Sequence, residues 1–149
     1  MPGVIEAINT SPAHGTLQSS VDSAELLVGI GLEGDRYANA EGGVVSMIEA
    51  EQVEAFNEAT GLGISAAATC RNLVTRGVRL NVLVGKRFKL GDAIVECFEL
   101  CEPCASLGAR LATETVSAAE VVKAFTHTAG IRARIIASGS IEPGTPVSD

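Results

Sequence analysis

Tryptophan is absent from the 149-residue sequence, and the other aromatic residues amount to four Phe and one Tyr. The hydrophobic core must therefore come mainly from aliphatic side chains, and these are plentiful: hydrophobic residues make up 46% of the chain and charged residues 19%. This balance excludes an intrinsically disordered chain. The length is that of one domain, so we expect residues 1–149 to fold as a single unit with a sizeable core.

Basic residues are also scarce, because eleven Lys and Arg stand against eighteen Asp and Glu, for a net charge of −7. Without a basic stripe, the chain is not expected to bind nucleic acid. No apolar run approaches the roughly 20 residues that span a bilayer. Residues 1–10 lack the basic and then apolar pattern of a secretory signal. We therefore expect a cytoplasmic protein without a membrane partner, whose four cysteines stay reduced.

Sixteen glycines divide the chain into short segments. Segment 49–60 has the pattern of an amphipathic helix that stops at Gly61, and segments 105–111 and 118–125 also predict helices. Segment 24–28 predicts a short helical turn. The predicted strands are 2–8, 44–48, 72–75, 80–84, 87–90, 93–100, 131–137 and 145–147. Together these segments predict an α+β fold, mostly β, in which a barrel carries two or three peripheral helices.

Three of the four cysteines, Cys97, Cys101 and Cys104, have the spacing C-x3-C-x2-C. An iron–sulfur site of the radical SAM type would need a larger α/β barrel than this chain can supply. A four-thiolate zinc site would also require Cys70, although only Cys101 and Cys104 have the spacing of a ligand pair. A redox dithiol of Cys101 and Cys104 would lie where a strand gives way to a helix. Cys97 lies inside a predicted strand, and we expect it to be a core residue.

Cys104 has the most reactive predicted setting. It follows Pro103 and precedes the predicted helix 105–111, whose N-terminal dipole and free N–H groups would favour the thiolate. Glu99 and Glu102 are close in sequence and would raise the thiol pKa if they were also close in space. A thiolate at this position can act as a nucleophile, a sulfur carrier or a soft metal ligand.

Several short motifs follow one another in a recognisable order. They are Gly34-Asp35-Arg36-Tyr37, Arg71-Asn72-Leu73-Val74, Val84-Gly85, Leu90-Gly91-Asp92, Glu102-Pro103-Cys104, Arg132 after Gly130, and the segment 139–144. In this order and at these intervals they resemble the MOSC domain, the module at the C-terminus of molybdenum-cofactor sulfurases, over residues 4–147. The resemblance implies a closed, Greek-key-like β-barrel similar to the barrel inserted in pyruvate kinases.

The resemblance also implies a single functional cysteine, which aligns with Cys104. In the sulfurases, a pyridoxal-phosphate domain makes persulfide sulfur and the MOSC domain binds the molybdenum cofactor. In amidoxime-reducing relatives, the equivalent cysteine ligates molybdenum, and stand-alone members are thought to carry persulfide sulfur or to act on N-hydroxylated compounds. We therefore expect a sulfur carrier and molybdenum-cofactor-binding module, possessing a sulfurtransferase-type activity if it turns over. Its expected partners are a cysteine desulfurase or other sulfur donor, and the cofactor or a molybdoenzyme as acceptor.

The remaining site candidates follow from the chemistry of that cofactor. Its phosphate calls for guanidinium groups, and its metal and dithiolene favour a soft thiolate. The candidates are Cys104 as nucleophile or metal ligand, Cys101 as resolving thiol, Arg36 and Arg71 for the phosphate, Asn72 for pterin polar atoms, Asp35 to orient an arginine, and Arg132, whose direction the sequence does not decide. His14 and His127 are isolated in the sequence and are assigned no role.

Two departures from the family pattern concern cofactors. Tyr37 stands where many small relatives have a histidine, and the N-terminal barrel half of the amidoxime reducers is missing. We therefore expect no tightly bound metal. A pyridoxal-phosphate Schiff base would need a desolvated lysine, which the sequence does not indicate. The alternative functions are molybdenum-cofactor-dependent reduction of N-hydroxylated compounds, or a non-catalytic binding domain or one stabilised by zinc.

Overall fold

The computed structural model describes residues 3–10, 19–35 and 42–148. Its strands are β1 (Gly3–Thr10), β2 (Ser19–Val21), β3 (Ala24–Leu27), β4 (Gly31–Leu32), β5 (Val44–Glu49), β6 (Leu73–Arg76), β7 (Arg87–Leu90), β8 (Ala93–Leu100), β9 (Ile131–Ala137), β10 (Gly139–Ile141) and β11 (Pro146–Ser148). Its helices are α1 (Ala50–Thr60), α2 (Ala105–Leu111) and α3 (Ala118–Phe125), with the short 3-10 helices η1 (Ala66–Thr69) and η2 (Asn81–Leu83).

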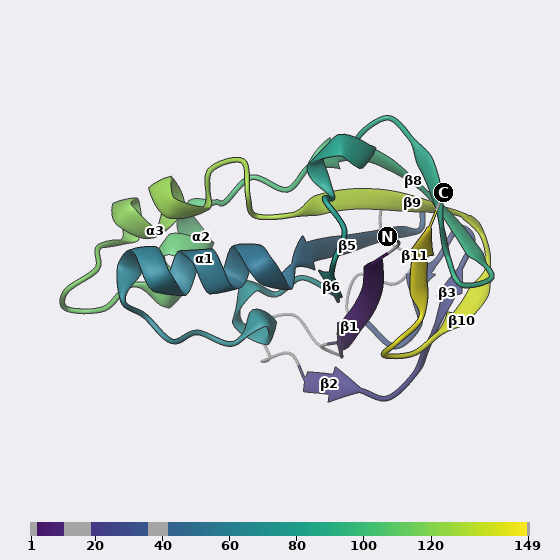
Figure 1. The fold of residues 1–149 in the computed structure, drawn as a ribbon, viewed down its shortest axis with the longest axis horizontal. Helices are drawn as coiled ribbons and strands as arrows, with labels where there is room; N and C mark the ends of the chain where they lie inside the picture. Colours follow the sequence, from purple (N-terminus) through teal and green to yellow (C-terminus); the bar gives the residue numbers. More distant parts are fainter. Residues whose placement is uncertain (1–2, 11–18, 36–41, 149) are drawn as a thin grey trace.

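Within these residues, seven strands close into a barrel in the order β11-β7-β8-β9-β5-β6-β1. The circle is completed where β1 pairs with β11, through Gly3 with Val147 and Val4 with Pro146. Neighbouring barrel strands are antiparallel except β5 and β6, which are parallel and are joined through α1. Strand β2 extends the sheet beyond β1, and β10, β3 and β4 form a small separate sheet. The predicted fold, a closed and mostly β barrel with three α-helices outside it, is confirmed (Figure 1).

The barrel interior is filled by alternate side chains of its strands. In β9 the buried residues Ile131, Ala133 and Ile135 alternate with exposed arginines, as the two-residue period of a strand requires. Met47 and Leu73 meet them from neighbouring strands and are also fully buried. The core is therefore aliphatic, as the scarcity of aromatic residues predicts.

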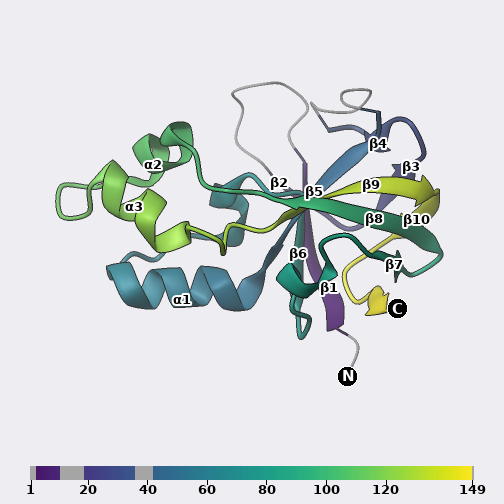
Figure 2. The same cartoon turned by 90° about the horizontal axis from the view of Figure 1, so that it is seen from above.

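The three α-helices lie together beyond one end of the barrel, as Figure 2 shows from above. They enclose a second apolar cluster, in which Ile48 at the end of β5 meets Phe56 of α1 and Phe125 of α3. The two phenyl rings stack with centroids 4.1 Å apart and planes 8° from parallel. A capping box between Ser117 and Glu120 begins α3. This cluster fixes the helices against the end of the barrel at which the candidate site is built.

Two predicted elements were wrong. Segment 24–28 is not a helical turn but strand β3, because Leu26 is buried and pairs with Gly139 of β10, a partner that lies far along the chain. Segment 80–84 is not a strand, because Leu80 and Leu83 turn inward together and close a 3-10 turn through a 2.9 Å hydrogen bond from Leu83 N to Leu80 O. In the part of the chain that the structure describes, no helix is both long and apolar enough to cross a membrane.

Candidate functional site

The candidate site begins where β8 leaves the barrel. A bulge between Cys97 and Glu99 shifts the register of β8, so that Glu99 faces Arg132 of β9. Beyond the strand, the Cys101 N–H donates to Gly130 O at 2.8 Å. This bond holds the chain next to the start of β9, and the Cys101 side chain is buried there with 4% exposure.

Cys104 lies at the point where the chain turns from this segment into α2. It is the N-cap residue of the helix, with an extended backbone, and its carbonyl accepts the first helical hydrogen bond from Gly108 N at 3.1 Å. Its thiol is exposed. The backbone N–H groups of Leu107 and Ser106 and the charge of Arg71 lower the pKa of the Cys104 thiol, against a smaller opposing effect of burial. The predicted thiolate-favouring setting is therefore present in the structure.

The two site thiols have opposite tendencies. Burial raises the pKa of the Cys101 thiol, and the guanidinium charges of Arg71 and Arg132 oppose this effect. Arg132 is exposed on β9, yet it lies near enough to Cys101 for its side chain to lower the pKa of the thiol, and its role in the site stays a prediction. The arrangement thus combines an exposed cysteine disposed to ionise with a buried cysteine disposed to stay protonated.

Arg71 is the group that both thiols share. Its Nε donates to Ala129 O at 2.8 Å, and one terminal nitrogen donates to Thr69 O at 3.4 Å. These carbonyls fix a half-buried guanidinium, whose charge acts on Cys101 and on Cys104. The structure therefore brings together Cys101, Cys104, Arg71 and Arg132 from the predicted set.

The other predicted residues have different surroundings. Asn72 is 5% exposed, and its Oδ1 accepts from both the N–H and the hydroxyl of Ser46, at 3.2 and 3.1 Å. Its Nδ2 donates to Asn9 O at 3.3 Å, so the side chain links β1 to β5. Asp35 is buried in the turn after β4, and Arg36 lies outside the described residues. Roles of Asn72, Asp35 and Arg36 toward a cofactor stay predictions.

One pair of residues beside this site was not predicted from the sequence. Glu102 and His127 contact each other twice: the His127 N–H donates to Oε1 at 2.7 Å, and Nδ1 lies 2.6 Å from Oε2. These hydrogen bonds lower the pKa of the Glu102 carboxyl. The carboxylate two residues before Cys104 is thus turned toward His127. His127 makes both contacts from a left-handed backbone, at φ +66°, and Glu102 lies 25 residues away in the chain, so a local sequence pattern does not reveal them.

The remaining cysteines stay apart from this chemistry. Cys97 is fully buried in the barrel, which confirms the expectation of a core residue. Cys70 is half-buried in a left-handed turn at φ +61°. Among the described residues, which include all four cysteines, no group of three or more His, Cys, Asp or Glu side chains is placed to hold a metal ion. The four-thiolate zinc alternative therefore gains no support from this part of the chain.

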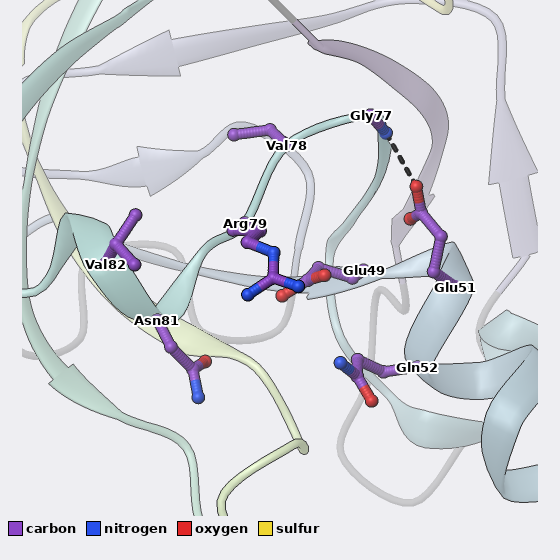
Figure 3. Close-up of a pocket in the computed structure, with 8 residues that line it drawn as sticks. All are labelled: Glu49, Glu51, Gln52, Gly77, Val78, Arg79, Asn81 and Val82. Carbon is purple, nitrogen blue, oxygen red and sulfur yellow. Dashed lines mark hydrogen bonds between the residues drawn. The ribbon is translucent and has the colours of Figure 1, made fainter.

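A separate pocket of about 470 Å³ lies between the start of α1 and η2. Figure 3 shows Glu49 and Arg79 facing each other on its wall, with Asn81 nearby. Its lining includes none of the predicted site residues. Asn81 nevertheless connects it to the candidate site, because its Nδ2 donates to the carbonyl of His127 at 2.7 Å.

Comparison with known proteins gives one family and several solved structures. The family model described as MOSC domain matches residues 35–148. The structure is similar to that of the YuaD protein of Bacillus subtilis, with a TM-score of 0.83 and 18% identity over 99% of this chain and 94% of that one. It is also similar to YiiM of Geobacillus stearothermophilus, with a TM-score of 0.75 and 19% identity over 99% of this chain and 74% of that one.

YiiM of Escherichia coli gives a TM-score of 0.72 and 20% identity, over 99% of this chain and 69% of that one. At such identities these likenesses show the fold. The search of curated proteins gives no match. The family match covers both site cysteines and both site arginines.

Proposed function

Because the chain belongs to the MOSC domain family, we propose that it carries sulfur as a persulfide on Cys104 and binds the molybdenum cofactor beside that thiol. The observation that carries the proposal is the exposed Cys104 thiol, whose pKa is lowered by the N-terminus of α2 and by Arg71. A thiolate, not a thiol, is the nucleophile in sulfur exchange. The exposure of Cys104 and its lowered thiol pKa therefore both favour a sulfur carrier.

Loading requires a donor that holds sulfane sulfur, such as the persulfide of a cysteine desulfurase. The Cys104 thiolate attacks the outer sulfur of the donor persulfide. An S–S bond forms on Cys104 while the donor's S–S bond breaks, and the donor leaves as a thiolate. No electrons are gained or lost overall. The positive charge of Arg71 stabilises both the attacking thiolate and the persulfide anion that replaces it.

Unloading can follow either of two balanced routes. An acceptor nucleophile can take the outer sulfur, which returns Cys104 as a thiolate. Alternatively, Cys101 loses its proton and attacks the inner sulfur of the Cys104 persulfide, which forms a disulfide and releases hydrosulfide. In that second route the two cysteines are oxidised and the sulfane sulfur is reduced. A thioredoxin-like dithiol must then reduce the disulfide before the next cycle.

The residues present at the site fit the chemistry of the molybdenum cofactor. Cys104 offers the soft thiolate that molybdenum favours, and Arg71 and Arg132 offer two guanidinium groups for a phosphate. Asn72 is buried, its Oδ1 accepts two hydrogen bonds and its Nδ2 donates to Asn9 O, so the proposed cofactor contacts rest on Cys104, Arg71 and Arg132 and not on this amide. When bound, the cofactor would supply a redox-active metal with sulfur ligands.

The sulfur-carrier part is tested by intact mass after incubation with a cysteine desulfurase and free cysteine. The wild type is expected to gain one sulfur atom that cyanide removes, and Cys104→Ala is expected to gain none. Cys70→Ala is the matched control, because it removes a half-buried thiol and should load like the wild type. An unchanged mass of the wild type would refute the carrier function.

The cofactor-binding part is tested separately by titrating the protein with molybdopterin and measuring the bound fraction. Arg71→Met and Arg132→Met are each expected to weaken binding, because each removes a charge-assisted contact to the phosphate. Arg79→Met, in the pocket beside α1, is the control for loss of one positive charge. Equal affinity of all four proteins would show that the two arginines do not hold the phosphate.

A further inference from the structure

His127 adopts a backbone conformation that its residue type disfavours. Its φ of +66° lies in the left-handed region, which glycine adopts readily and in which other residues are strained. The side chain is 73% exposed, so packing in the core does not explain the choice of histidine. A strained residue that persists without a packing reason points to a use for its side chain.

The contacts of His127 identify that use. Its N–H donates to Oε1 of Glu102 at 2.7 Å and its Nδ1 lies 2.6 Å from Oε2, so one residue engages both oxygens of one carboxylate. An ionised carboxylate only accepts hydrogen bonds, and Nδ1 therefore carries the proton between them. The carbonyl of His127 is held in turn by Nδ2 of Asn81 at 2.7 Å.

These contacts fasten the segment that presents Cys104. The chain from β8 to α2 is tied to the loop before β9 at Cys101, whose N–H donates to Gly130 O, and again at Glu102. Cys104 follows after a single proline, whose ring restricts the backbone between them. The same loop provides Ala129 O, which holds Arg71. One short segment thus sets the positions of the thiol, its neighbouring carboxylate and its neighbouring guanidinium.

We propose that His127 is a positioning residue for Cys104: its left-handed backbone and imidazole hold the Glu102 carboxylate, fix the segment 101–104 and keep that negative charge directed away from the thiol. The biological purpose of this arrangement rests on the proposed sulfur-carrier function, since a persulfide and its attacking thiolate are both anionic. The arrangement itself concerns Cys104 in the isolated protein and can be measured without any sulfur transfer.

The experiment compares two alkylating reagents of similar size, the anionic iodoacetate and the neutral iodoacetamide. Their rates at Cys104 are followed by peptide mass, and the ratio of the two rates is normalised to the same protein unfolded in urea. The ratio cancels changes in the thiolate fraction and reports the charge near the sulfur. It is measured for wild type, His127→Gly, His127→Asn and the double variant Glu102→Gln/His127→Gly.

In His127→Gly the backbone keeps its φ without strain, while the carboxylate loses its imidazole partner. A freed carboxylate about 7 Å from the reagent in a water-like medium lowers the iodoacetate-to-iodoacetamide ratio about threefold. His127→Asn should restore much of the wild-type ratio, because asparagine tolerates this conformation and offers a side-chain N–H. The double variant should return to the wild-type ratio, since no negative charge remains to be released.

A wild-type ratio in His127→Gly would overturn the proposal, as would a low ratio that persists in the double variant, because that change would be structural. Thermal melting of each variant accompanies the labelling. If His127→Gly does not fold, Glu102→Gln alone replaces it: a ratio equal to wild type supports the proposal, and a raised ratio shows that the carboxylate already faces the thiol. If Cys104 fails to load persulfide while the threefold change is seen, only the sulfur-carrier function is lost.

Discussion

At the scale of single residues, the site depends on two cysteines that have two residues between them in the sequence but lie in different environments. Cys104 faces solvent and the N-terminus of a helix, whereas Cys101 is buried against the barrel. Arg71 lowers the pKa of both thiols, but burial is the largest influence at Cys101, whereas the hydrogen bond from the Leu107 N–H is the largest at Cys104. The two thiols therefore differ in burial and in backbone N–H contacts more than in the effect of Arg71.

Replacing Arg71 should change the reactivity of Cys104. In Arg71→Met the lost positive charge raises the pKa of the Cys104 thiol, so the pH profile of its alkylation by iodoacetamide shifts to higher pH. Arg71→Lys keeps the charge and should shift less. Loss of the bond from Nε to Ala129 O is expected to cost about 1 kcal/mol of stability in both variants. Identical pH profiles for the three proteins would contradict the role of the guanidinium charge.

Glu49 gives a residue-scale prediction about stability and pH. Burial raises its pKa above the usual value, with a smaller opposing hydrogen bond from the N–H of Leu80. The ionised carboxylate therefore disfavours folding at neutral pH, and this penalty disappears below about pH 4, where the group is neutral in both states. Glu49→Gln should stabilise the protein at pH 7 by about 0.5 kcal/mol after allowance for solvent screening.

The measurement is thermal melting at pH 7 and at about pH 4, where the gain of Glu49→Gln should vanish. Glu58→Gln is the matched control, since Glu58 is an exposed acid on α1, the helix that Glu49 precedes. An equal gain in both variants would show that the effect comes from net charge alone.

At the scale of elements, the loop that joins α3 to β9 organises the site. Its backbone holds Glu102 through His127, Arg71 through Ala129 O and Cys101 through Gly130 O. Gly130 is required at its end, because its φ is +105° and a Cβ there would lie 2.0 Å from the carbonyl oxygen of Met47. The close approach of this loop to β5 brings the three contacts together.

Gly130→Ala should therefore destabilise the protein severely, by at least about 3 kcal/mol, because backbone at such a contact has little room to move. Gly61→Ala is the matched control: φ is +76° there, but nothing lies within 4 Å of the added Cβ, and the expected loss is about 1 kcal/mol. Urea denaturation of both variants measures the difference. Similar midpoints for the two would show that the contact with Met47 relaxes easily.

Local sequence patterns predicted those elements whose helical or strand form does not depend on segments far along the chain. The strands β7, β8 and β9 and the helices α2 and α3 have the predicted bounds, because alternation, capping and glycine positions determine them locally. The strands β3 and β10 pair across more than a hundred residues, so segment 24–28 was misread and β10 was not predicted. For the same reason Cys104 and Arg71 were expected individually, whereas the contact between Glu102 and His127 required the folded structure.

At the scale of the whole molecule, the barrel is closed by a short seam. Strand β11 pairs with β1 at Gly3 and Val4 on one side and with β7 at Lys89 and Leu90 on the other. Val147 is the residue of β11 that faces the core, with 2% exposure. The closed state therefore depends on one apolar side chain and a few backbone hydrogen bonds contributed by the last strand.

A charge at this position should open the seam. Val147→Asp places a carboxylate in the barrel core without a partner and should cost at least about 3 kcal/mol. Ser148→Asp, the next residue of the strand, is half-buried and should cost less than about 1 kcal/mol. Hydrogen exchange at the amides of Ile5 and Gly91, which donate to Thr145 O and Pro146 O beside the seam, is expected to accelerate in the first variant alone. Wild-type exchange in Val147→Asp would show that closure does not need this side chain.

The seam also constrains the order of events during synthesis. Strand β1 leaves the ribosome before the other described strands, and its partner β11 emerges only after residue 147 has been added. Until then the edge of β1 that β11 will cover remains unpaired, and unpaired strand edges are sites of association between chains. Because this closing contact spans nearly the whole described chain, the loop it closes is long and its formation is slow. The nascent polypeptide must therefore protect the edge of β1 until β11 has emerged.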